Sequence, residues 1–456
     1  MNKTLRGFES TLAFLPKELF TLLERFHEQG HSLFLCGGSV RDLLLGGFPT
    51  DWDLASSASP EEILAFLPHN WIHQGSRGQE WGSFLLRLGE LSLELTSFRS
   101  EGNYRDHRHP NEVWFHRELD RDWQRRDFTV NALYMDLSNG LLVDPCGGVE
   151  DLRAKRLKTI GKPCARFSED PLRILRGIRF SSEIDLVPEG ETWQSLCDHA
   201  DHTLELSGSR VGKELQAIVL GKGRARGLRL LWNSGVLAAL LPELQALEEV
   251  PQPPMFHPEG PVLLHTECVL ANLPEPVSPA LAWAALLHDI GKKQCFSRGE
   301  DRIRFHGHDM VSAEQARKIL GRLSIPKSVQ DACCSLIEEH IRIASFPEWR
   351  EKRKVTFLRD PLFLKHLSLH KADCLGSHRL LGIYEVLLQQ WRQIPPLPPK
   401  PLLSGKDLIQ KGWKPGPLFR ELFDEIEALR AEGRIQNRED ALLFADEFMR
   451  MRKGCR

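Results

Sequence analysis

The sequence has no apolar run that approaches the roughly 18 residues needed for a membrane-spanning helix, and its start, MNKTLRGFESTLAFL, carries an acidic residue before any long apolar stretch. We therefore expect neither a membrane segment nor a secretory leader, and predict a cytoplasmic protein. The ten cysteines are scattered and never form a C-x-x-C pair, which argues against a zinc ribbon and a secreted disulfide framework. Internal repeats and low-complexity tracts are also missing from the sequence.

An excess of charge of one sign is missing as well, because 60 Lys and Arg stand against 62 Asp and Glu, for a net charge of -2. A polyanionic partner must therefore meet a local basic patch. Residues 151–180 form such a patch, with nine Lys or Arg against three Asp or Glu. A solvated charged face is the alternative interpretation of this segment.

The chain has 456 residues, which is more than one hydrophobic core usually supports. The length therefore predicts roughly three domains. Proline clusters at 251–254 and 395–399 predict boundaries there. Before about residue 150, short strands such as HSLFLCGG and LSLELTSF mix with a predicted helix, PEEILAFL. From about residue 165 the apolar spacing becomes helical, and we expect the strands to stop. The predicted fold is thus a mixed α and β head followed by all-α domains.

A glycine turn and two carboxylates in the head point to phosphate chemistry. Gly37 and Gly38 follow an apolar strand and precede a helix-like segment, a place where backbone N–H groups can approach a phosphate. If Asp51 and Asp53 lie on a strand, alternation places both carboxylates on one face about 6–7 Å apart, where they can share divalent ions. Each feature alone is weak, since most glycine turns and D-x-D pairs are only structural.

Their order and spacing add a resemblance. The run GGSVRDLLLG followed by DWD resembles the nucleotidyltransferase head of class II CCA-adding enzymes and bacterial poly(A) polymerases, with the pattern GG-x-VRD-x-LLG and D-x-D. The segments LELTSFR at 93–99, RRDFTVNA at 125–132 and DPCGG at 144–148 resemble further family blocks in the expected order. The resemblance covers at least residues 33–180, and a weak SGKDL-like match at 405–408 extends it toward the end of the chain.

The resemblance implies a polymerase β-like head over residues 1–150, a helical neck over 151–250, an HD domain over 251–394 and a helical tail over 395–456. It also implies that Gly38 and Arg41 contact the incoming nucleotide, that Asp51 and Asp53 hold Mg²⁺, and that Arg126 and Asp127 line the nucleotide pocket. Two points stay open. Glu94 is either a third acidic group near the metals or an exposed strand residue, and Arg41 with Asp42 can form a simple ion pair.

A second motif concerns the choice of base. One acidic and three basic residues recur every three positions on a predicted helix: Asp170, Arg173, Arg176 and Arg179. Adjacent members can share one ligand, whereas the first and the last point about half a turn apart. A carboxylate accepts from the amino group of cytosine or adenine, and a guanidinium donates to the adjacent ring nitrogen. Uracil and guanine present the opposite pattern. The ED-x-x-R spacing also resembles the protein-side template of the same family.

The histidine-rich middle of the chain carries a second candidate site. Leu287-His288-Asp289-Ile290-Gly291-Lys292 resembles the signature of HD phosphohydrolases. The resemblance implies metal ligands among helices, and imidazole with carboxylate suits Mn, Ni, Co or Mg. The candidate ligands are His265, His288, Asp289, His308, His340 and Asp373. Two alternatives stay open. The domain is either an active phosphatase or phosphodiesterase, or it retains these residues without turnover or uses the fold only to hold tRNA.

Together these features predict template-independent nucleotidyl transfer from CTP and ATP to the 3′ end of tRNA, with the acceptor arm bound through phosphate and shape. Addition of CCA, addition of the terminal A alone, and poly(A) tailing remain alternatives. The segment 101–116 is long enough for the family's mobile loop, so CC-only addition is the least expected. Two rivals are a working HD phosphohydrolase beside a relic head, and a non-catalytic tRNA-binding protein. The oligomeric state stays open.

Overall fold

The computed structural model divides into two compact units, Met1–Trp391 and Arg392–Arg456, which are described separately. Within the described part of the chain, no helix has both the length and the apolar character that crossing a membrane requires. The subdivision of the first unit near residues 150 and 250 stays a prediction. The described residues are 3–5, 12–13, 15–73, 81–102, 112–299, 303–394, 401–431 and 434–453.

The head is built on one seven-stranded mixed sheet with the order β1-β9-β8-β2-β3-β5-β4. Strands β3 and β5 pair in parallel and the other neighbours pair antiparallel. The parallel register places Asp53 opposite Glu94. A separate hairpin joins β6 (Arg99–Glu101) and β7 (Val113–Phe115). The sheet strands are β1 (Lys3–Leu5), β2 (Leu33–Cys36), β3 (Trp52–Ser56), β4 (Ser83–Leu88), β5 (Leu91–Ser97), β8 (Tyr134–Asp136) and β9 (Leu142–Asp144).

Four helices accompany this sheet: α1 (Lys17–Glu28), α2 (Gly38–Leu44), α3 (Pro60–Phe66) and α4 (Gly148–Arg153). Helix α1 buries an apolar stripe, Leu19, Leu22 and Phe26, at the three- and four-residue spacing of an amphipathic helix. The predicted PEEILAFL helix is α3, which begins with a capping box between Ser59 and Glu62. The mixed head with its helices is confirmed.

The helices that follow the head are interrupted at the base-selection motif. Asp170 is the C-cap of α5 and Pro171 is the N-cap of α6, so Asp170 lies in the junction between two helices. The expectation that Asp170 shares a helix with Arg173 was therefore wrong, because proline removes a backbone donor and opens a new helix. The helices here are α5 (Pro163–Glu169), α6 (Leu172–Glu183), α7 (Gly190–Asp198), α8 (Gly208–Leu220), α9 (Arg224–Asn233), α10 (Val236–Leu240) and α11 (Pro242–Gln245).

Strands do not stop entirely at residue 165. Two-residue strands recur as the parallel pair β10 (Arg156–Leu157) and β11 (Val187–Pro188) and as the hairpin β12 (Ser297–Arg298) and β13 (Ile303–Arg304). The periodicity did not predict them because two residues are too few to show an alternation. The rest of this region is helical, as expected.

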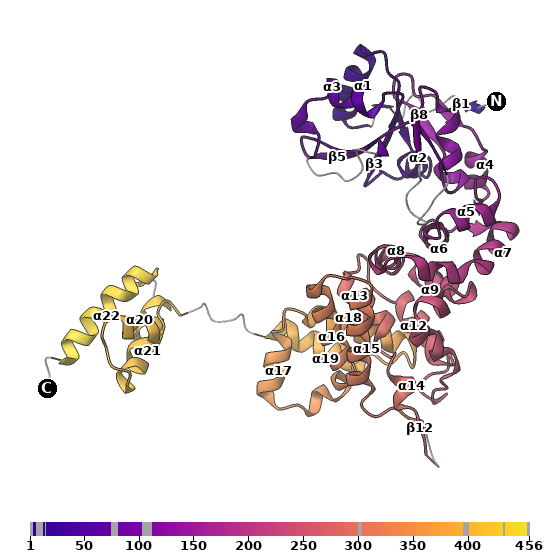
Figure 1. Ribbon diagram of the computed structural model, residues 1–456. Helices are drawn as coiled ribbons and strands as arrows, with labels where there is room; N and C mark the ends of the chain where they lie inside the picture. The colour runs from indigo at the N-terminus through magenta and orange to yellow at the C-terminus, as the bar shows by residue number, and fades with distance from the viewer. Residues whose placement is uncertain are drawn as a thin grey trace. The chain divides into compact units, whose positions relative to one another are not determined.

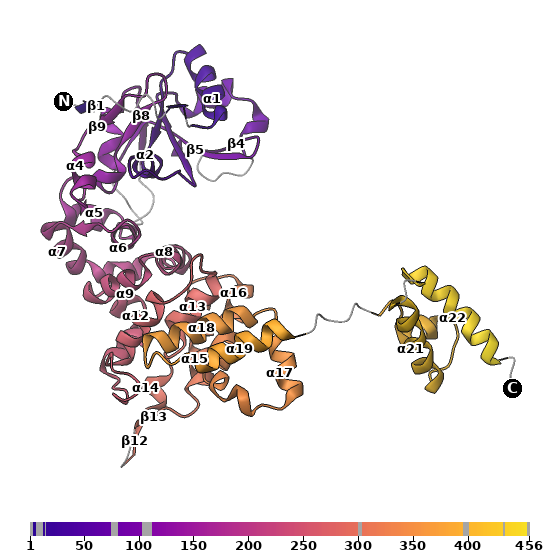
Figure 2. The same cartoon turned by 180° about the vertical axis from the view of Figure 1, so that it is seen from behind.

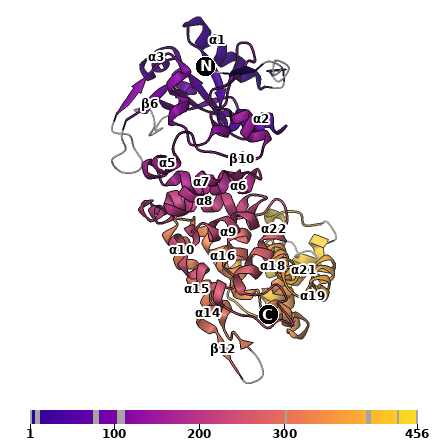
Figure 3. The ribbon, with the colours of Figure 1, turned by 90° about the vertical axis from the view of Figure 1, so that its right-hand side faces the viewer.

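One continuous apolar core runs from the end of the head through the helices up to α18. It includes Ile218 of α8, Leu231 of α9, Val269 of α12 and Leu287 of α13, all buried. Figures 1 and 2 show α6, α8 and α9 between the sheet and the later helices of the first unit, α12 to α19, and Figure 3 shows the same order from the side. The later helices are α12 (Val262–Ala271), α13 (Pro279–Leu287), α14 (Lys292–Cys295), α15 (His308–Arg322), α16 (Lys327–Glu339), α17 (Glu351–Leu358), α18 (Phe363–Gly376) and α19 (Gly382–Gln393).

The second unit has its own small core. Helices α20 (Gly405–Gln410), α21 (Pro417–Ala431) and α22 (Arg438–Lys453) bury Leu408 and Leu422 among other apolar side chains. The SGKDL-like motif begins α20, where Ser404 and Asp407 form a capping box.

Candidate active site

A cavity of about 1370 Å³ lies between the head sheet and helices α6 and α8, and it gathers residues from distant motifs. Both predicted metal carboxylates and the complete predicted base-selection motif line it. Asp170 and Arg173 therefore share one cleft with Asp51 and Asp53. The predicted residues on its wall are Gly38, Arg41, Asp51, Asp53, Arg126, Asp127, Asp170, Arg173, Arg176 and Arg179.

The glycine turn and the D-x-D segment are tied together by Ser39. Its hydroxyl donates to the carbonyl of Asp51 at 2.9 Å and accepts from the backbone N–H of Asp53 at 2.8 Å. Gly37 has φ of 63°, and a Cβ there would lie 3.1 Å from Nη1 of Arg126. Glycine is therefore required at this position both for its backbone conformation and for the space that the guanidinium occupies. Asp51 precedes β3, so only Asp53 lies on the strand itself.

Asp53 lies in a cluster of acidic groups. Burial, together with the charges of Glu94 and Asp51, raises the pKa of its carboxyl to about 6 against the opposing charges of Arg126 and Arg176. Glu94 also lines the cavity, as its strand register beside Asp53 requires. Three neighbouring carboxylates in one cleft repel one another, and a bound cation relieves such repulsion. Their oxygen atoms are the donors that Mg²⁺ prefers.

Arg41 forms the ion pair with Asp42 that the sequence offered as the alternative to nucleotide contact, and it also contacts a second motif in the cleft. Its Nη2 lies 2.8 Å from Oδ1 of Asp42, and its Nη1 donates to Oδ1 of Asn131 at 2.8 Å. Asn131 belongs to the RRDFTVNA block and lines the cavity, but sequence reasoning did not select it. Its place in that block was the available signal. Arg41 is thus held on the wall of the cleft by two separate motifs.

A buried acid that the motifs did not identify holds the two adjacent arginines. Oδ1 of Asp122 lies 2.8 Å from Nη2 of Arg125, and Oδ2 lies 3.3 Å from Nη2 of Arg126. Tyr134 donates its hydroxyl to the same carboxylate at 2.7 Å. Although burial acts in the other direction, these partners lower the pKa of Asp122 to about 2, so it stays ionised. Its position four residues before Arg126 was the only sequence signal.

Asp127 connects the head to α6. Its Oδ2 accepts from Nε of Arg176 at 2.7 Å, and its Oδ1 accepts from Nδ2 of Asn131 and from the N–H of Phe128. Against burial, the charge and hydrogen bond of Arg176 lower the pKa of Asp127 to about 2. Asp127 therefore fixes the cleft arginine Arg176 in place.

The base-selection pair lies in a polar setting on the same wall. Arg173 is buried, with Nη1 donating to Oε2 of Glu169 at 2.7 Å and Nη2 donating to the carbonyl of Arg125 at 3.1 Å. Asp170 accepts from the N–H of Leu172 at 3.1 Å and pairs with Arg210 at 3.0 Å. The plane of the Arg173 guanidinium is thus held by acceptors from two elements. Arg210 of α8 lies outside the motif, which is why the sequence did not identify it.

Arg179 completes the arginine series in the cleft. Its Nε donates to Oε2 of Glu214 at 2.7 Å, and its Nη1 lies 3.3 Å from Oε2 of Glu183. Arg176 and Arg179 therefore take carboxylate partners from different elements, although they are three residues apart on α6.

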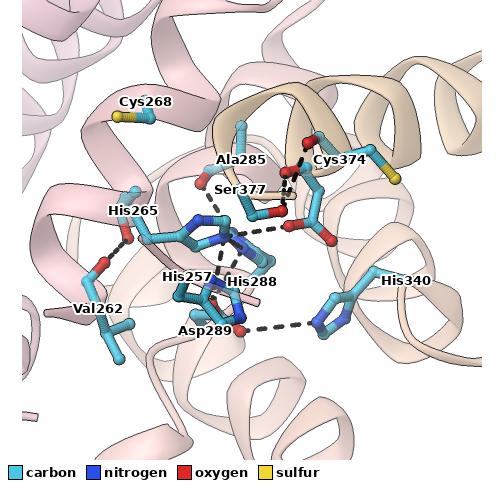
Figure 4. A network of polar contacts seen from close by, with 12 residues as sticks. His257, Val262, His265, Cys268, Ala285, His288, Asp289, His340, Cys374 and Ser377 are labelled. Carbon is cyan, nitrogen blue, oxygen red and sulfur yellow. Dashed lines mark hydrogen bonds and ion pairs between the residues drawn. The ribbon is translucent and has the colours of Figure 1, made fainter. Parts of the chain in front are cut away.

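The six predicted HD residues come together in a second, separate cluster. Two groups of three have ligand atoms within 4.8 Å of one another, one with His265, His288 and Asp373 and one with Asp289, His308 and His340. Asp289 lies between the groups, because its Oδ2 is 3.2 Å from Nε2 of His288 and its Oδ1 is 3.2 Å from Nε2 of His308. Figure 4 shows His265, His340 and the consecutive residues His288 and Asp289 converging from separate segments of the chain. These donor sets are consistent with divalent metal binding.

The imidazoles of this cluster are oriented by backbone carbonyls. Nδ1 of His288, of His308 and of His340 each lies in hydrogen-bond contact with the carbonyl three residues earlier. A ring that donates from Nδ1 presents its Nε2 lone pair, and this second contact fixes the tautomer that metal ligands need. The preceding helical turn thus aims the rings of His288 and His340 at the cluster, and the segment before α15 aims that of His308.

Two further residues, which the sequence did not single out as ligands, support His265. Oε1 of Glu259 lies 2.8 Å from Nδ1 of His265 and 2.9 Å from Nδ1 of His257. The rings of His265 and His257 are labelled in Figure 4. Against the effect of burial, Asp373 and Glu259 raise the pKa of His265 to about 9. Glu259 and His257 lie in the loop before α12, outside the HD signature, and no motif marked them.

The predicted switching loop 101–116 cannot be compared in full, since residues 103–111 lie outside the described part of the chain. Its two ends are described. They form β6 and β7, and Glu101 at the first end lines the cavity and pairs with Arg99 at 2.8 Å.

Comparison with family models matches three consecutive segments of the chain. The poly A polymerase head domain covers residues 33–158, the probable RNA and SrmB-binding site of polymerase A covers 185–247, and the HD domain covers 264–358. The three matches follow one another in the order of the sequence motifs.

Relatives that align over nearly the whole chain include CCA-adding enzymes of several bacteria. A CCA-adding enzyme of Lactococcus lactis subsp. cremoris is 38% identical over 439 residues, which cover 94% of this chain and 96% of that protein. A CCA-adding enzyme of Anoxybacillus flavithermus is 29% identical over 428 residues, 93% of this chain and 95% of that protein. The crystal structure of the Bacillus stearothermophilus CCA-adding enzyme in complex with CTP shares the fold, with a TM-score of 0.64 at 24% identity, covering 96% of this chain and 99% of that one. The chain therefore belongs to the CCA-adding enzymes, the tRNA nucleotidyltransferase family that its motifs resemble.

Proposed function

We propose that this protein adds CCA to the 3′ end of tRNA from CTP and ATP, without a nucleic acid template and with release of pyrophosphate. The observation that carries the proposal is that Asp51, Asp53, Asp170 and Arg173 line one cleft in a chain of this family. Carboxylates for phosphoryl chemistry and a donor–acceptor pair for the base are thereby within reach of one elongated ligand.

The acidic group formed by Asp51 and Asp53, with Glu94 beside them, fits Mg²⁺ because it offers only oxygen donors from mutually repelling carboxylates on the wall of one cleft. When bound, the cations would lower the pKa of the primer hydroxyl and neutralise charge on the pyrophosphate. The 3′-hydroxyl oxygen of the primer forms a bond to the α-phosphorus, and the bond from that phosphorus to pyrophosphate breaks. No covalent enzyme intermediate is needed.

The remaining cleft residues bind and select the nucleotide. Gly38, Arg41, Arg126 and Arg176 would contact its phosphates, with Asp127 holding Arg176 in place. Asp170 would accept from the amino group of cytosine or adenine while Arg173 donates to the ring nitrogen. A carboxylate has about four lone-pair sites, so Asp170 can accept this bond beside its contact with Arg210. Uracil or guanine would leave a desolvated charge facing a like group, at a cost of about 1–3 kcal/mol.

The basic segment of residues 151–180 and the neck helices would bind the tRNA acceptor arm through phosphate contacts and shape. The matched RNA-binding model over residues 185–247 supports this placement. We place the functional boundaries near residues 150, 250 and 395, and the reaction in the cytoplasm.

The test is gel-resolved extension of three tRNA substrates, ending at the discriminator base, at C and at CC, with CTP, ATP or both. The proposal requires addition of C, C and A in turn, with termination after A. Extension of only the CC-ended substrate would instead identify terminal-A addition, and untemplated runs of A would identify poly(A) tailing. The comparisons favour CCA addition over the last alternative.

A second activity is favoured by the convergence of all six HD residues. We propose that this cluster binds a divalent metal such as Mn, Ni or Co and hydrolyses a phosphoester, as a phosphatase or phosphodiesterase. When bound, the metal would activate water. Hydrolysis of bis-p-nitrophenyl phosphate by the full chain should require added metal and should be lost in His288→Ala. If the wild-type chain hydrolyses neither this diester nor the corresponding monoester with any of these metals, the cluster is not a working phosphohydrolase.

A further inference from the structure

One aromatic ring in the cleft contacts three of its arginines. The guanidinium carbon of Arg179 lies 4.4 Å from the ring centroid of Phe180, and those of Arg41 and Arg176 each lie 5.1 Å from it. Arg41 comes from α2 in the head and the other two come from α6. Phe180 lines the cavity although it is nearly buried. The ring is therefore a meeting point of two elements that face the same ligand space.

The chemistry of this contact differs from that of the ion pairs around it. An aromatic face attracts a cation through its quadrupole when the cation lies within about 6 Å of the centroid. This attraction uses none of the five N–H donors of a guanidinium, whereas a carboxylate partner takes up one or two of them. In the part of the chain that the structure describes, Arg176 makes its hydrogen bond through Nε, to Asp127. Its terminal nitrogens remain available to ligand oxygens.

Three guanidinium groups around one point also repel one another. Each has its own carboxylate partner, Asp42, Asp127 or Glu214, on a different element. These partners balance the charge, and each holds its own arginine separately. Among the described residues, the Phe180 ring is the side chain in cation–π contact with all three arginines, so it can set their positions relative to one another.

We propose that Phe180 is a positioning residue that holds Arg41, Arg176 and Arg179 together for phosphate groups through the electron density of its ring. This inference rests on the proposed function of the cleft and names the ligand chemistry of one wall. The phosphates belong either to the triphosphate of the incoming nucleotide or to the RNA primer. Both sources present the same anionic oxygens, which guanidinium groups bind well.

A purely structural role for Phe180 makes a different prediction. The ring packs at right angles against Phe128, with centroids 6.0 Å apart, in the apolar core. If packing is its only role, ring size and shape matter and ring electron density does not. Fluorination separates the two, because each fluorine withdraws electron density from the ring face while changing its shape little.

The experiment incorporates 4-fluoro-, 3,5-difluoro- and 3,4,5-trifluorophenylalanine at position 180 of the full chain, with the same series at Phe128 as the matched control. Dissociation constants for ATP are measured by equilibrium dialysis, and those for tRNA ending at CC by filter binding. Since cation–π attraction weakens with each fluorine, we expect at least one of the two constants to rise stepwise, by about tenfold for the trifluoro ring. The melting temperature should stay constant along the series.

The arm that responds identifies the source of the phosphates. A rise for ATP alone assigns the wall to the triphosphate, and a rise for tRNA alone assigns it to the primer. The inference is overturned if neither constant changes along the series at Phe180, or if the Phe128 series shifts them equally. Because binding is measured directly, a wild-type chain that binds ATP but extends no tRNA would reject the proposed function and still decide this inference.

Discussion

Replacing Asp170 by asparagine should relax base selection while leaving the fold intact. The side chains of Asp170 and Arg210 are each about one-fifth exposed, and asparagine keeps one oxygen acceptor for Arg210, so the substitution should cost about 1–3 kcal/mol of stability without unfolding the chain. The change keeps one oxygen acceptor and adds an N–H donor in the same volume. An amide can rotate to offer either group to a base, whereas a carboxylate can only accept.

The expected magnitude follows from counting the mismatches with UTP. Uracil places a carbonyl against Asp170 and a ring N–H against Arg173, two unfavourable contacts of about 1–3 kcal/mol each. Asparagine at position 170 relieves the first and leaves the second, since Arg173 stays held by Glu169 and the Arg125 carbonyl. Relief of about 1.4 kcal/mol corresponds to a tenfold smaller preference for CTP over UTP.

The assay is single-nucleotide extension of tRNA ending at the discriminator base, with kcat/KM measured separately for CTP and UTP. Asp201→Asn, an exposed position in the neck, is the matched control and should keep the wild-type ratio. If Asp170→Asn lowers both kcat/KM values equally, Asp170 supports the cleft without reading the base. The proposed selection by Asp170 and Arg173 would then be rejected.

The double change Asp51→Ala with Asp53→Ala should reduce nucleotide addition at least about a thousandfold by removing the carboxylates for the cations, while metal-dependent hydrolysis stays constant; the opposite pattern would favour the HD cluster as the working site. Glu259→Gln should weaken metal binding by the HD cluster by about 10–100-fold in equilibrium dialysis, because His265 loses its charged partner, whereas exposed Glu249→Gln should not; equal affinities would exclude this supporting role. Burial lowers the pKa of His366 to about 4 in the folded chain. Between about pH 6.5 and 4 the unfolded chain therefore binds one more proton than the folded chain. The free energy of unfolding should thus decrease as the pH is lowered, by about 2 kcal/mol from pH 7 to pH 5. In urea titrations His366→Phe should lack this loss, and an unchanged pH dependence would refute it.

Short motifs predicted the chemical groups of both sites, because the residues of such motifs are neighbours in sequence. Asp51 and Asp53 frame the start of one strand, and His288 with Asp289 ends one helix. The convergence of the first pair with Asp170, and of the second pair with Asp373, came from the family resemblance, since no local pattern encodes a distance between residues far apart in the sequence. The all-α character of the later chain was likewise readable from its apolar spacing.

Residues that act on other residues were not predicted. Asp122, Asn131, Phe180 and Glu259 work through tertiary contacts, and their types are common in any sequence. The helix break at Asp170 and Pro171 was missed because three-residue spacing on both sides resembles a single helix. Proline there was the available signal, since it disfavours continuation of the preceding helix.

The common core of the neck and HD helices has a practical consequence for separating the two proposed activities. Helices α8 and α9 bury leucine and isoleucine side chains in the same apolar interior as α12 and α13. A Cβ on Gly212 of α8 would lie 2.1 Å from the carbonyl oxygen of Leu323, so backbones from the two regions are in direct contact. Cutting the chain at the prolines near residue 251 would expose that interior to water on both fragments. Point substitutions in the intact chain are therefore the sound way to assign each reaction to its own centre.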